Sequence, residues 1–99
     1  MRNAVRLGGR IVERQPLRYT PAGIAIVQLR LSHRSRQNQA RLERDIDLDI
    51  AATAAGDIAQ RLDPVALGTL IEAAGFLAQR SRNVRSAVLH ITEFEIIED

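Results

Sequence analysis

Apolar and polar residues alternate along much of this chain, and this period of two constrains the fold more than any other feature. The clearest example lies between residues 43 and 51, where three aspartates alternate with three apolar residues: Asp45, Ile46, Asp47, Leu48, Asp49 and Ile50. A strand places successive side chains on opposite faces of a sheet, so such a segment buries one face and exposes the other. The pattern therefore predicts an all-β protein, with Ile46, Leu48 and Ile50 facing inward.

Five segments carry this strand pattern. They cover residues 3–14, 23–33, 43–51, 68–79 and 87–97. Gly8, Gly9 and Gly75 lie inside such segments, where glycine is typical of a bulge or a sharp bend. A further bulge near Thr92 would keep the apolar residues on both sides of it buried.

The connections between these segments have turn or helix signals. Residues 20–23 read Thr-Pro-Ala-Gly and fit a type I turn. Residues 34–41 are rich in Ser, Gln and Asn, which predicts a mobile loop. A short helix is expected from about Asp57 to Leu62, because Pro64 disfavours its continuation.

The order of these elements predicts one fold. Three strands, a short helix and then two strands are the order of an OB-fold, a five-stranded barrel with the helix between strands three and four. A β-sandwich would need about seven strands. We therefore expect a single OB-fold domain over residues 1–99.

Composition excludes several classes of protein. The chain has no cysteine, so it has no disulfide framework and no thiolate metal site. No apolar run approaches the ~20 residues of a membrane span. The first six residues lack the apolar core of a secretory signal. We expect a cytoplasmic protein.

The formal net charge of +2 conceals an uneven distribution. Residues 1–44 hold ten arginines against two acids, whereas residues 45–79 hold six acids against Arg61. A basic half is typical of proteins with a polyanionic partner. The alternative is a G+C-rich gene that encodes every cation as arginine, since the chain has no lysine.

Catalysis and metal binding have little support in the sequence. Asp45, Asp47 and Asp49 share one strand face and could bind a divalent cation in a nuclease, but no other element supplies converging carboxylates. We instead expect cross-strand ion pairs between these aspartates and neighbouring arginines, namely Arg6, Arg10, Arg14 or Arg30. His33 and His90 are far apart in sequence, so neither a metal site nor a cofactor is expected.

Nucleic-acid binding fits the arginine clusters better. Proteins that bind single strands combine a positive groove with aromatic stacking platforms. The candidate nucleic-acid-binding residues are Arg18, Arg34, Arg44, Arg80, Arg82 and Arg85. Tyr19, Phe76 and Phe94 are the chain's aromatic residues, and both phenylalanines are expected in the core. The sequence therefore predicts weak, salt-sensitive binding dominated by phosphate contacts.

Several short motifs, in this order and spacing, resemble one family. They are Pro16-Leu17-Arg18, Pro21-Ala22-Gly23-Ile24, Leu31-Ser32-His33-Arg34-Ser35, Gly75-Phe76-Leu77-Ala78-Gln79 and Val88-Leu89-His90-Ile91. Together they resemble primosomal replication protein N, also called primosomal protein B. The resemblance implies a non-enzymatic OB-fold homodimer that binds single-stranded DNA during replication restart. Its implied partners are the primosomal helicase (primosomal protein A) and the helicase-loading protein of the primosome.

The resemblance also implies roles for individual residues. Arg34 and Arg44 match basic positions of the family, and Arg80, Arg82 and Arg85 stand where the family has lysines. Leu42 and Asp47 occupy places where members from enteric bacteria carry aromatic residues. An alternative from another class remains open, a protein–protein adaptor whose arginines pair with its own acids. A metal-dependent nuclease is the third.

Overall fold

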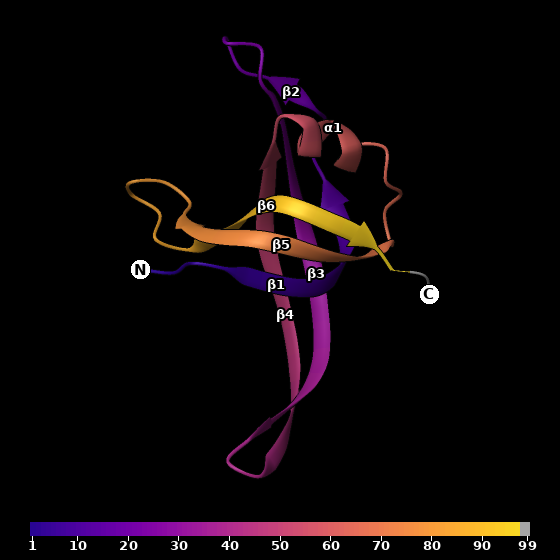
Figure 1. The fold of residues 1–99 in the computed structure, drawn as a ribbon, viewed down its shortest axis with the longest axis vertical. Helices are drawn as coiled ribbons and strands as arrows, with labels where there is room; N and C mark the ends of the chain where they lie inside the picture. Colours follow the sequence, from indigo (N-terminus) through magenta and orange to yellow (C-terminus); the bar gives the residue numbers. More distant parts are fainter. Residues whose placement is uncertain (98–99) are drawn as a thin grey trace.

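The computed structural model describes residues 1–97, which form a small β-barrel. Its elements are β1 (Val5–Arg14), β2 (Arg18–Tyr19), β3 (Ala25–Gln39), β4 (Leu42–Ala55), α1 (Asp57–Leu62), β5 (Leu70–Gln79) and β6 (Ala87–Ile96). β1 pairs with β5 through its first half and with β3 through its second half, and a short parallel pairing joins β4 to β6. These pairings close the five long strands into a barrel (Figure 1). In the chain, α1 follows β4 and precedes β5. The predicted OB-fold is confirmed.

The core lies inside the barrel and beneath α1. The largest fully buried side chains are Ile11, Val27, Leu31, Leu62, Ile71 and Leu89. Ala59 and Leu62 form the buried face of α1, which covers one end of the barrel. Each fully buried Val, Leu or Ile contributes roughly 1.5–3 kcal/mol of hydrophobic free energy. Alternation along β3 places Val27, Leu29 and Leu31 inside the barrel.

The bulge predicted near Thr92 is present, but it does not bury Ile96, which is 57% exposed. The pairing of β5 with β6 shifts register between Ala74 and Gly75, where Thr92 is left out of the ladder. A Cβ built on Gly75 would lie 1.8 Å from the carbonyl oxygen of His90. Glycine is therefore required at residue 75, because the two backbones approach too closely for any side chain.

The bulge expected at Gly8 or Gly9 is instead displaced along β1. The register of β1 against β3 shifts between Ile11 and Glu13, where β1 has exchanged β5 for β3 as its partner. Gly9 has a different role, since a Cβ there would lie 3.1 Å from the carbonyl oxygen of Ser32. It allows β1 and β3 to cross at close range.

The predicted turn before β3 is also present. The Gly23 amide donates to the carbonyl oxygen of Thr20 at 2.8 Å. A type II turn requires positive φ at its third residue, and Ala22 does not have it, whereas Gly23 has φ 84°. The geometry is that of a type I turn followed by a left-handed glycine.

The prediction of a mobile loop at residues 34–41 is wrong. β3 continues to Gln39, β4 begins at Leu42, and the pairing runs without interruption from Ile26–Ala55 to Gln39–Leu42. Only Ala40 and Arg41 form the turn, both with positive φ. We call residues 32–49 the arm, from the pair Ser32–Asp49 outward. The arm extends well beyond the barrel, and the molecule measures 50 × 34 × 21 Å (Figure 1).

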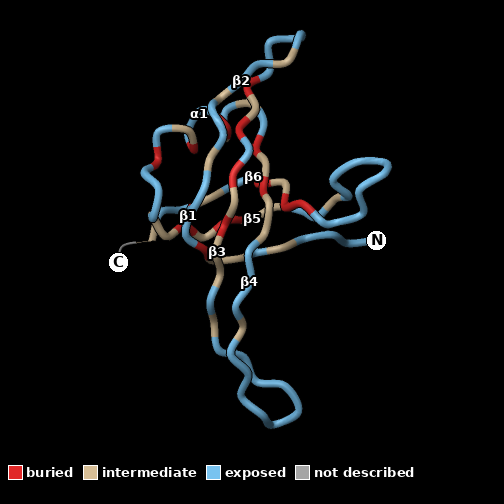
Figure 2. Tube along the Cα trace, turned by 180° about the vertical axis from the view of Figure 1, so that it is seen from behind, coloured by how far each residue is buried: buried red, intermediate tan, exposed pale blue. Residues whose placement is uncertain are grey.

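The apolar residues of the arm are more exposed than the sequence predicted. Ile46 and Leu48 share the inward-facing side of β4, but Leu48 is 39% exposed and Ile46 only half-buried. Figure 2 shows the buried residues concentrated in the barrel, while the arm is almost entirely exposed. Within residues 1–97, no helix is long and apolar enough to cross a membrane.

Candidate nucleic-acid interface

A hollow of about 550 Å³ lies on the outside of the barrel, over β3, β4 and β6. Its lining includes Gln28 and Arg30 from β3, Thr53 from β4 and His90 from β6. Arg18 on β2 and Arg80 after β5 also line it. We call this hollow the groove. Three arginines therefore come from separate elements to one concave surface.

The acidic residue in the groove is already paired. Glu13 lies 3.5 Å from the Nε atom of Arg30. Both side chains remain partly exposed to solvent, at 62% and 40% respectively, so this ion pair contributes little to stability. Because Glu13 and Arg30 neutralise each other, Arg18 and Arg80 give the groove a net positive charge, which favours an anionic ligand.

An aromatic pair stands beside these arginines. The rings of Phe76 and His90 stack with centroids 4.9 Å apart and planes inclined by 8°. Phe76 is 39% exposed, so its predicted place in the core is wrong. Ile71 and Ala73 lie on the buried face of β5. Phe76 lies on the opposite face, because successive side chains alternate, and it points outward beside His90.

The other phenylalanine does pack against the core. Phe94 is half-buried and contacts the core cluster. The guanidinium carbon of Arg61 lies 5.1 Å from the centroid of its ring, the geometry of a cation–π contact. Arg61 is thereby held away from the groove.

Residues 80–86 form the loop that the sequence predicted between β5 and β6. The Arg80 amide donates to the Ser86 carbonyl oxygen at 3.0 Å, and Ser81 and Val84 exchange backbone hydrogen bonds. The Gln79 side-chain amide donates to the carbonyl oxygens of Ser81 and Arg82. These contacts shape the loop while its arginines stay exposed.

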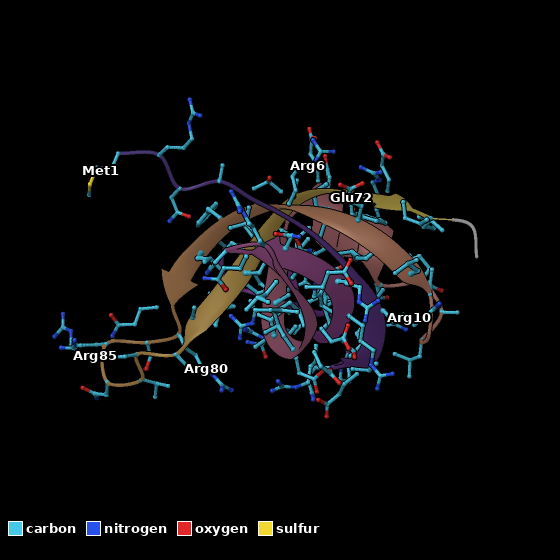
Figure 3. The ribbon with its side chains drawn as sticks, turned by 90° about the horizontal axis from the view of Figure 1, so that it is seen from below. Met1, Arg6, Arg10, Glu72, Arg80 and Arg85 are labelled. Carbon is cyan, nitrogen blue, oxygen red and sulfur yellow. The ribbon has the colours of Figure 1, made fainter. Side chains whose placement is uncertain are left out.

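No acid interrupts this part of the sequence, since the chain has none between Glu72 and Glu93. Figure 3 shows Arg80 and Arg85 projecting from the loop on one side of the barrel, while Arg6 and Glu72 lie on another side. Arg80 therefore lines the groove, and Arg82 and Arg85 lie in the loop that follows it, a segment without acidic residues.

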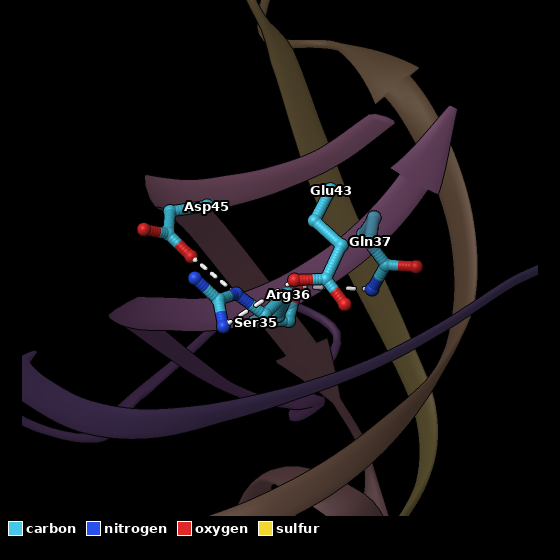
Figure 4. A network of polar contacts seen from close by, with 5 residues as sticks. All are labelled: Ser35, Arg36, Gln37, Glu43 and Asp45. Carbon is cyan, nitrogen blue, oxygen red and sulfur yellow. Dashed lines mark hydrogen bonds and ion pairs between the residues drawn. The ribbon is translucent and has the colours of Figure 1, made fainter. Parts of the chain in front are cut away.

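The arm presents its arginines differently. The register places Arg34 opposite Asp47 and Arg36 opposite Asp45. The Nε atom of Arg34 lies 3.5 Å from a carboxylate oxygen of Asp47, and that of Arg36 lies 3.1 Å from Asp45. Glu43 approaches Nη1 of Arg36 at 3.5 Å (Figure 4).

Cross-strand pairing of the aspartates is thus confirmed for Asp45 and Asp47, but the predicted partners were wrong. Arg6 pairs with Glu72 at 3.3 Å and Arg30 with Glu13. Arg10 and Arg14 donate to the carbonyl oxygens of Gly68 and Val65 respectively. The long β3–β4 pairing makes the arginines of the arm the direct neighbours of its aspartates.

Arg44 lies on the other face of the arm. Its partner in the register is Gln37, and its Nη1 atom donates to the side-chain oxygen of Gln39 at 2.6 Å. Arg34 and Arg44 therefore point to opposite faces of the two-stranded ribbon, because successive side chains in a strand alternate.

The six arginines predicted to bind nucleic acid thus fall into three places. Arg18 and Arg80 line the groove, with Arg82 and Arg85 in the loop that follows Arg80, whereas Arg34 lies on the charged face of the arm and Arg44 on the opposite face. Arg30, Phe76 and His90 also lie at or beside the groove and were not among the predicted residues. The alternation along β3 and β5 places Arg30 and Phe76 on the outer face of the barrel, and this pattern could have identified both residues.

Among the described residues, no three His, Cys, Asp or Glu side chains gather into a group that could hold a metal ion. The aspartate row of β4 is engaged by arginines instead. The groove therefore offers charge and aromatic surface, the two features that single-stranded nucleic acids recognise.

Comparisons with known proteins place the chain in a family. A family model described as "Another single-strand binding protein family" matches residues 3–93. The chain is 35% identical to the replication restart protein PriB of Nitrosomonas europaea over 96 residues, 97% of this chain and 89% of that protein. The chain belongs to the PriB family. The PriB protein of Bordetella pertussis is also 35% identical, over 92% of this chain and 85% of that protein.

Solved structures agree with this assignment. A PriB structure from Ralstonia solanacearum superposes with a TM-score of 0.89 and 37% identity, covering 99% of this chain and all of that chain. The single-stranded DNA binding protein of Thermus aquaticus shares the fold, with a TM-score of 0.77 and 24% identity over 97% of this chain and 50% of that chain. The resemblance seen in the sequence is confirmed.

Proposed function

We propose that this protein binds single-stranded DNA in the groove and acts in replication restart. The observation that carries the proposal is the arrangement of Arg18, Arg30 and Arg80 around one hollow, beside the stacked pair of Phe76 and His90. The names of the PriB relatives and of the matching family model support the process and the ligand.

Phosphates and bases would meet different residues. Arg18, Arg80, Arg82 and Arg85 contact the phosphates, and arginine suits this role because its guanidinium can make two parallel hydrogen bonds. A base stacks on the Phe76–His90 pair. Since base–aromatic stacking contributes about 1–3 kcal/mol per base and the groove offers a single such pair, binding is weak and salt-sensitive.

Arg34 and Arg44 differ in their position relative to a DNA strand bound in the groove. A strand that left the groove along the outer faces of β3 and β4 would reach Arg34 first. Arg44 would stay on the far side of the ribbon. Of the two, Arg34 lies nearer to such a strand, but Asp47 already holds its guanidinium in an ion pair.

Titration of fluorescent oligo(dT) across a salt series tests the proposal. Each phosphate contact contributes about −0.7 to the slope of log K against log salt for a single strand. Four groove and loop arginines predict a slope of about −3, from four contacts at that value. A complete lack of binding at low salt would contradict the proposal.

The protein acts without catalysis and as a homodimer in this proposal. From Val5 to Gly9, β1 pairs with β5 on one edge, whereas its pairing with β3 begins at Arg10. An open strand edge is a template for pairing with a second copy. Ile24 is 49% exposed at the turn before β3, and Ile26 lines the groove. Light scattering at micromolar concentration should therefore give about twice 11.0 kDa, and a stable monomer would contradict this part.

The proposed protein partners are the primosomal helicase (primosomal protein A) and the helicase-loading protein of the primosome. A protein–protein adaptor that does not bind DNA remains the second candidate. The ion pairs of the arm favour it, because they occupy arginines that a DNA-binding protein would leave free. The oligo(dT) titration separates the two functions.

A further inference from the structure

The arm carries no net charge, although it contains four arginines. Its basic residues are Arg34, Arg36, Arg41 and Arg44, and its acidic residues are Glu43, Asp45, Asp47 and Asp49. Residues 73–92, by contrast, contain Arg80, Arg82 and Arg85 and no acid. A polyanion is therefore attracted to the loop and not to the arm as a whole.

The acids of the arm also occupy the atoms that a phosphate would use. Asp47 contacts Nε of Arg34, and Asp45 and Glu43 contact Nε and Nη1 of Arg36. Carboxylates and phosphates bind the same hydrogen-bonding edge of a guanidinium. A DNA phosphate that approached Nε of Arg34, or Nε or Nη1 of Arg36, would have to compete with a carboxylate already in place.

The row of acids continues to the base of the arm. Asp49 pairs with Ser32, and the next outward pair along the two strands is Ala51 with Arg30, which lines the groove. A strand that left the groove toward Arg34 would therefore pass Asp49 before it met Asp47.

We propose that Asp45 and Asp47, assisted by Glu43, act as internal competitors that keep Arg34 and Arg36 from the phosphates of single-stranded DNA. DNA is thereby restricted to the groove and the loop 80–86. This inference rests on the proposed function, and it assigns to the acids of the arm the role of limiting the bound length and the affinity.

The fold does not depend on these ion pairs, which makes the inference testable. The side chains of Arg34 and Asp47 are 81% and 68% exposed, and those of Arg36 and Asp45 are 66% and 81% exposed. Such exposed pairs contribute little to stability. The backbone pairing of β3 with β4 holds the arm together without them.

The test compares wild-type protein with the variant D45N/D47N in oligo(dT) titrations across a salt series. The variant should bind about three- to tenfold more tightly at low salt, since two exposed ion pairs no longer compete. Its slope of log K against log salt should steepen by about 1.4, from two added phosphate contacts at −0.7 each.

Two further sets of variants separate local competition from a general change in charge. E93Q/E95Q removes the same charge from a separate hollow, lined also by Arg6, Arg61 and Glu72, and should leave the slope unchanged. R34A/R36A should change wild-type affinity by about twofold or less, but should abolish the gain when combined with D45N/D47N. Circular dichroism of each variant verifies the fold.

The outcomes distinguish this inference from the proposed function. If wild type binds and D45N/D47N binds no more tightly, the inference is wrong while the proposed function stands. A gain that survives R34A/R36A, or that E93Q/E95Q reproduces, also overturns the inference. If neither wild type nor D45N/D47N binds oligo(dT), both are wrong.

Discussion

The loop 80–86 and the arm both present arginines to solvent, but they differ in what stands beside those arginines. In the loop, backbone hydrogen bonds and the Gln79 side chain shape the chain, and no acid lies nearby in sequence. In the arm, a carboxylate faces Arg34 and Arg36 directly across the strands. The number of arginines in a segment therefore does not decide whether it binds a polyanion.

The difference arises from the way each segment is built. A strand pair fixes which side chains are opposite, so an acidic strand beside a basic strand becomes a row of ion pairs. A loop has no such partner strand. The groove and the loop 80–86 are therefore available to DNA, whereas arginines of the arm already pair with acids of the arm.

The largest expected effect comes from Gly75→Ala, which disturbs the groove and leaves the arm untouched. The added Cβ would lie 1.8 Å from the carbonyl oxygen of His90, so β5 and β6 must separate. We expect a loss of stability on the order of 3 kcal/mol or more, measured by urea denaturation. Gly8→Ala is the matched control, because its Cβ would meet only the Ile71 carbonyl oxygen at 3.9 Å. Equal stability of the two variants would refute the requirement for glycine at residue 75.

The next effect in size concerns the loop. Replacing Arg80, Arg82 and Arg85 together by alanine should weaken binding of oligo(dT) and flatten the salt slope by about two units, from three contacts at 0.7 each. Arg61→Ala should change neither quantity, because Arg61 stacks over Phe94 away from the groove. If the triple variant keeps the wild-type slope, the loop is not the DNA site.

A smaller effect is expected from the aromatic pair. Phe76→Ala removes the ring that supports His90 and should reduce oligo(dT) affinity by about fivefold, near the lower end of the range for one stacked base. The salt slope should stay unchanged, since no charge is lost. Phe76→Leu, which keeps apolar bulk without a stacking face, should lose affinity similarly. Wild-type affinity in both variants would exclude base stacking at this position.

The smallest effect is expected from Arg44→Ala in the arm. Arg44 contacts Gln39 on the face opposite Arg34, so its loss should change affinity by about twofold or less, the size of a single exposed contact. The same titration measures it. A loss as large as that of the triple loop variant would show that DNA runs along the far face of the arm.

Much of the barrel could be predicted from the sequence, because alternation reports directly on a half-buried strand. The parity change in β6 even located the bulge at Thr92. Residues 34–39 were missed as strand because both faces of the arm are exposed, and an exposed strand has the polar composition of a loop.

The site was harder to predict than the fold. Alternation identifies the outward face of a strand but not the strand beside it, so the partners of Asp45 and Asp47 could not be named. Phe76 was assigned to the core by its residue type, although its parity in β5 turns it outward. Only the pairing of β5 with β6 brings it against His90.

In the function proposed above, single-stranded DNA occupies the groove and the loop 80–86 and leaves the arm free. Amide hydrogen exchange of the wild-type protein, with and without saturating oligo(dT), tests this most directly. We predict slower exchange in residues 76–90 and around Arg18, with no change in residues 34–45. Slower exchange along residues 34–45, with no change in residues 80–86, would show that DNA binds the arm and not the loop.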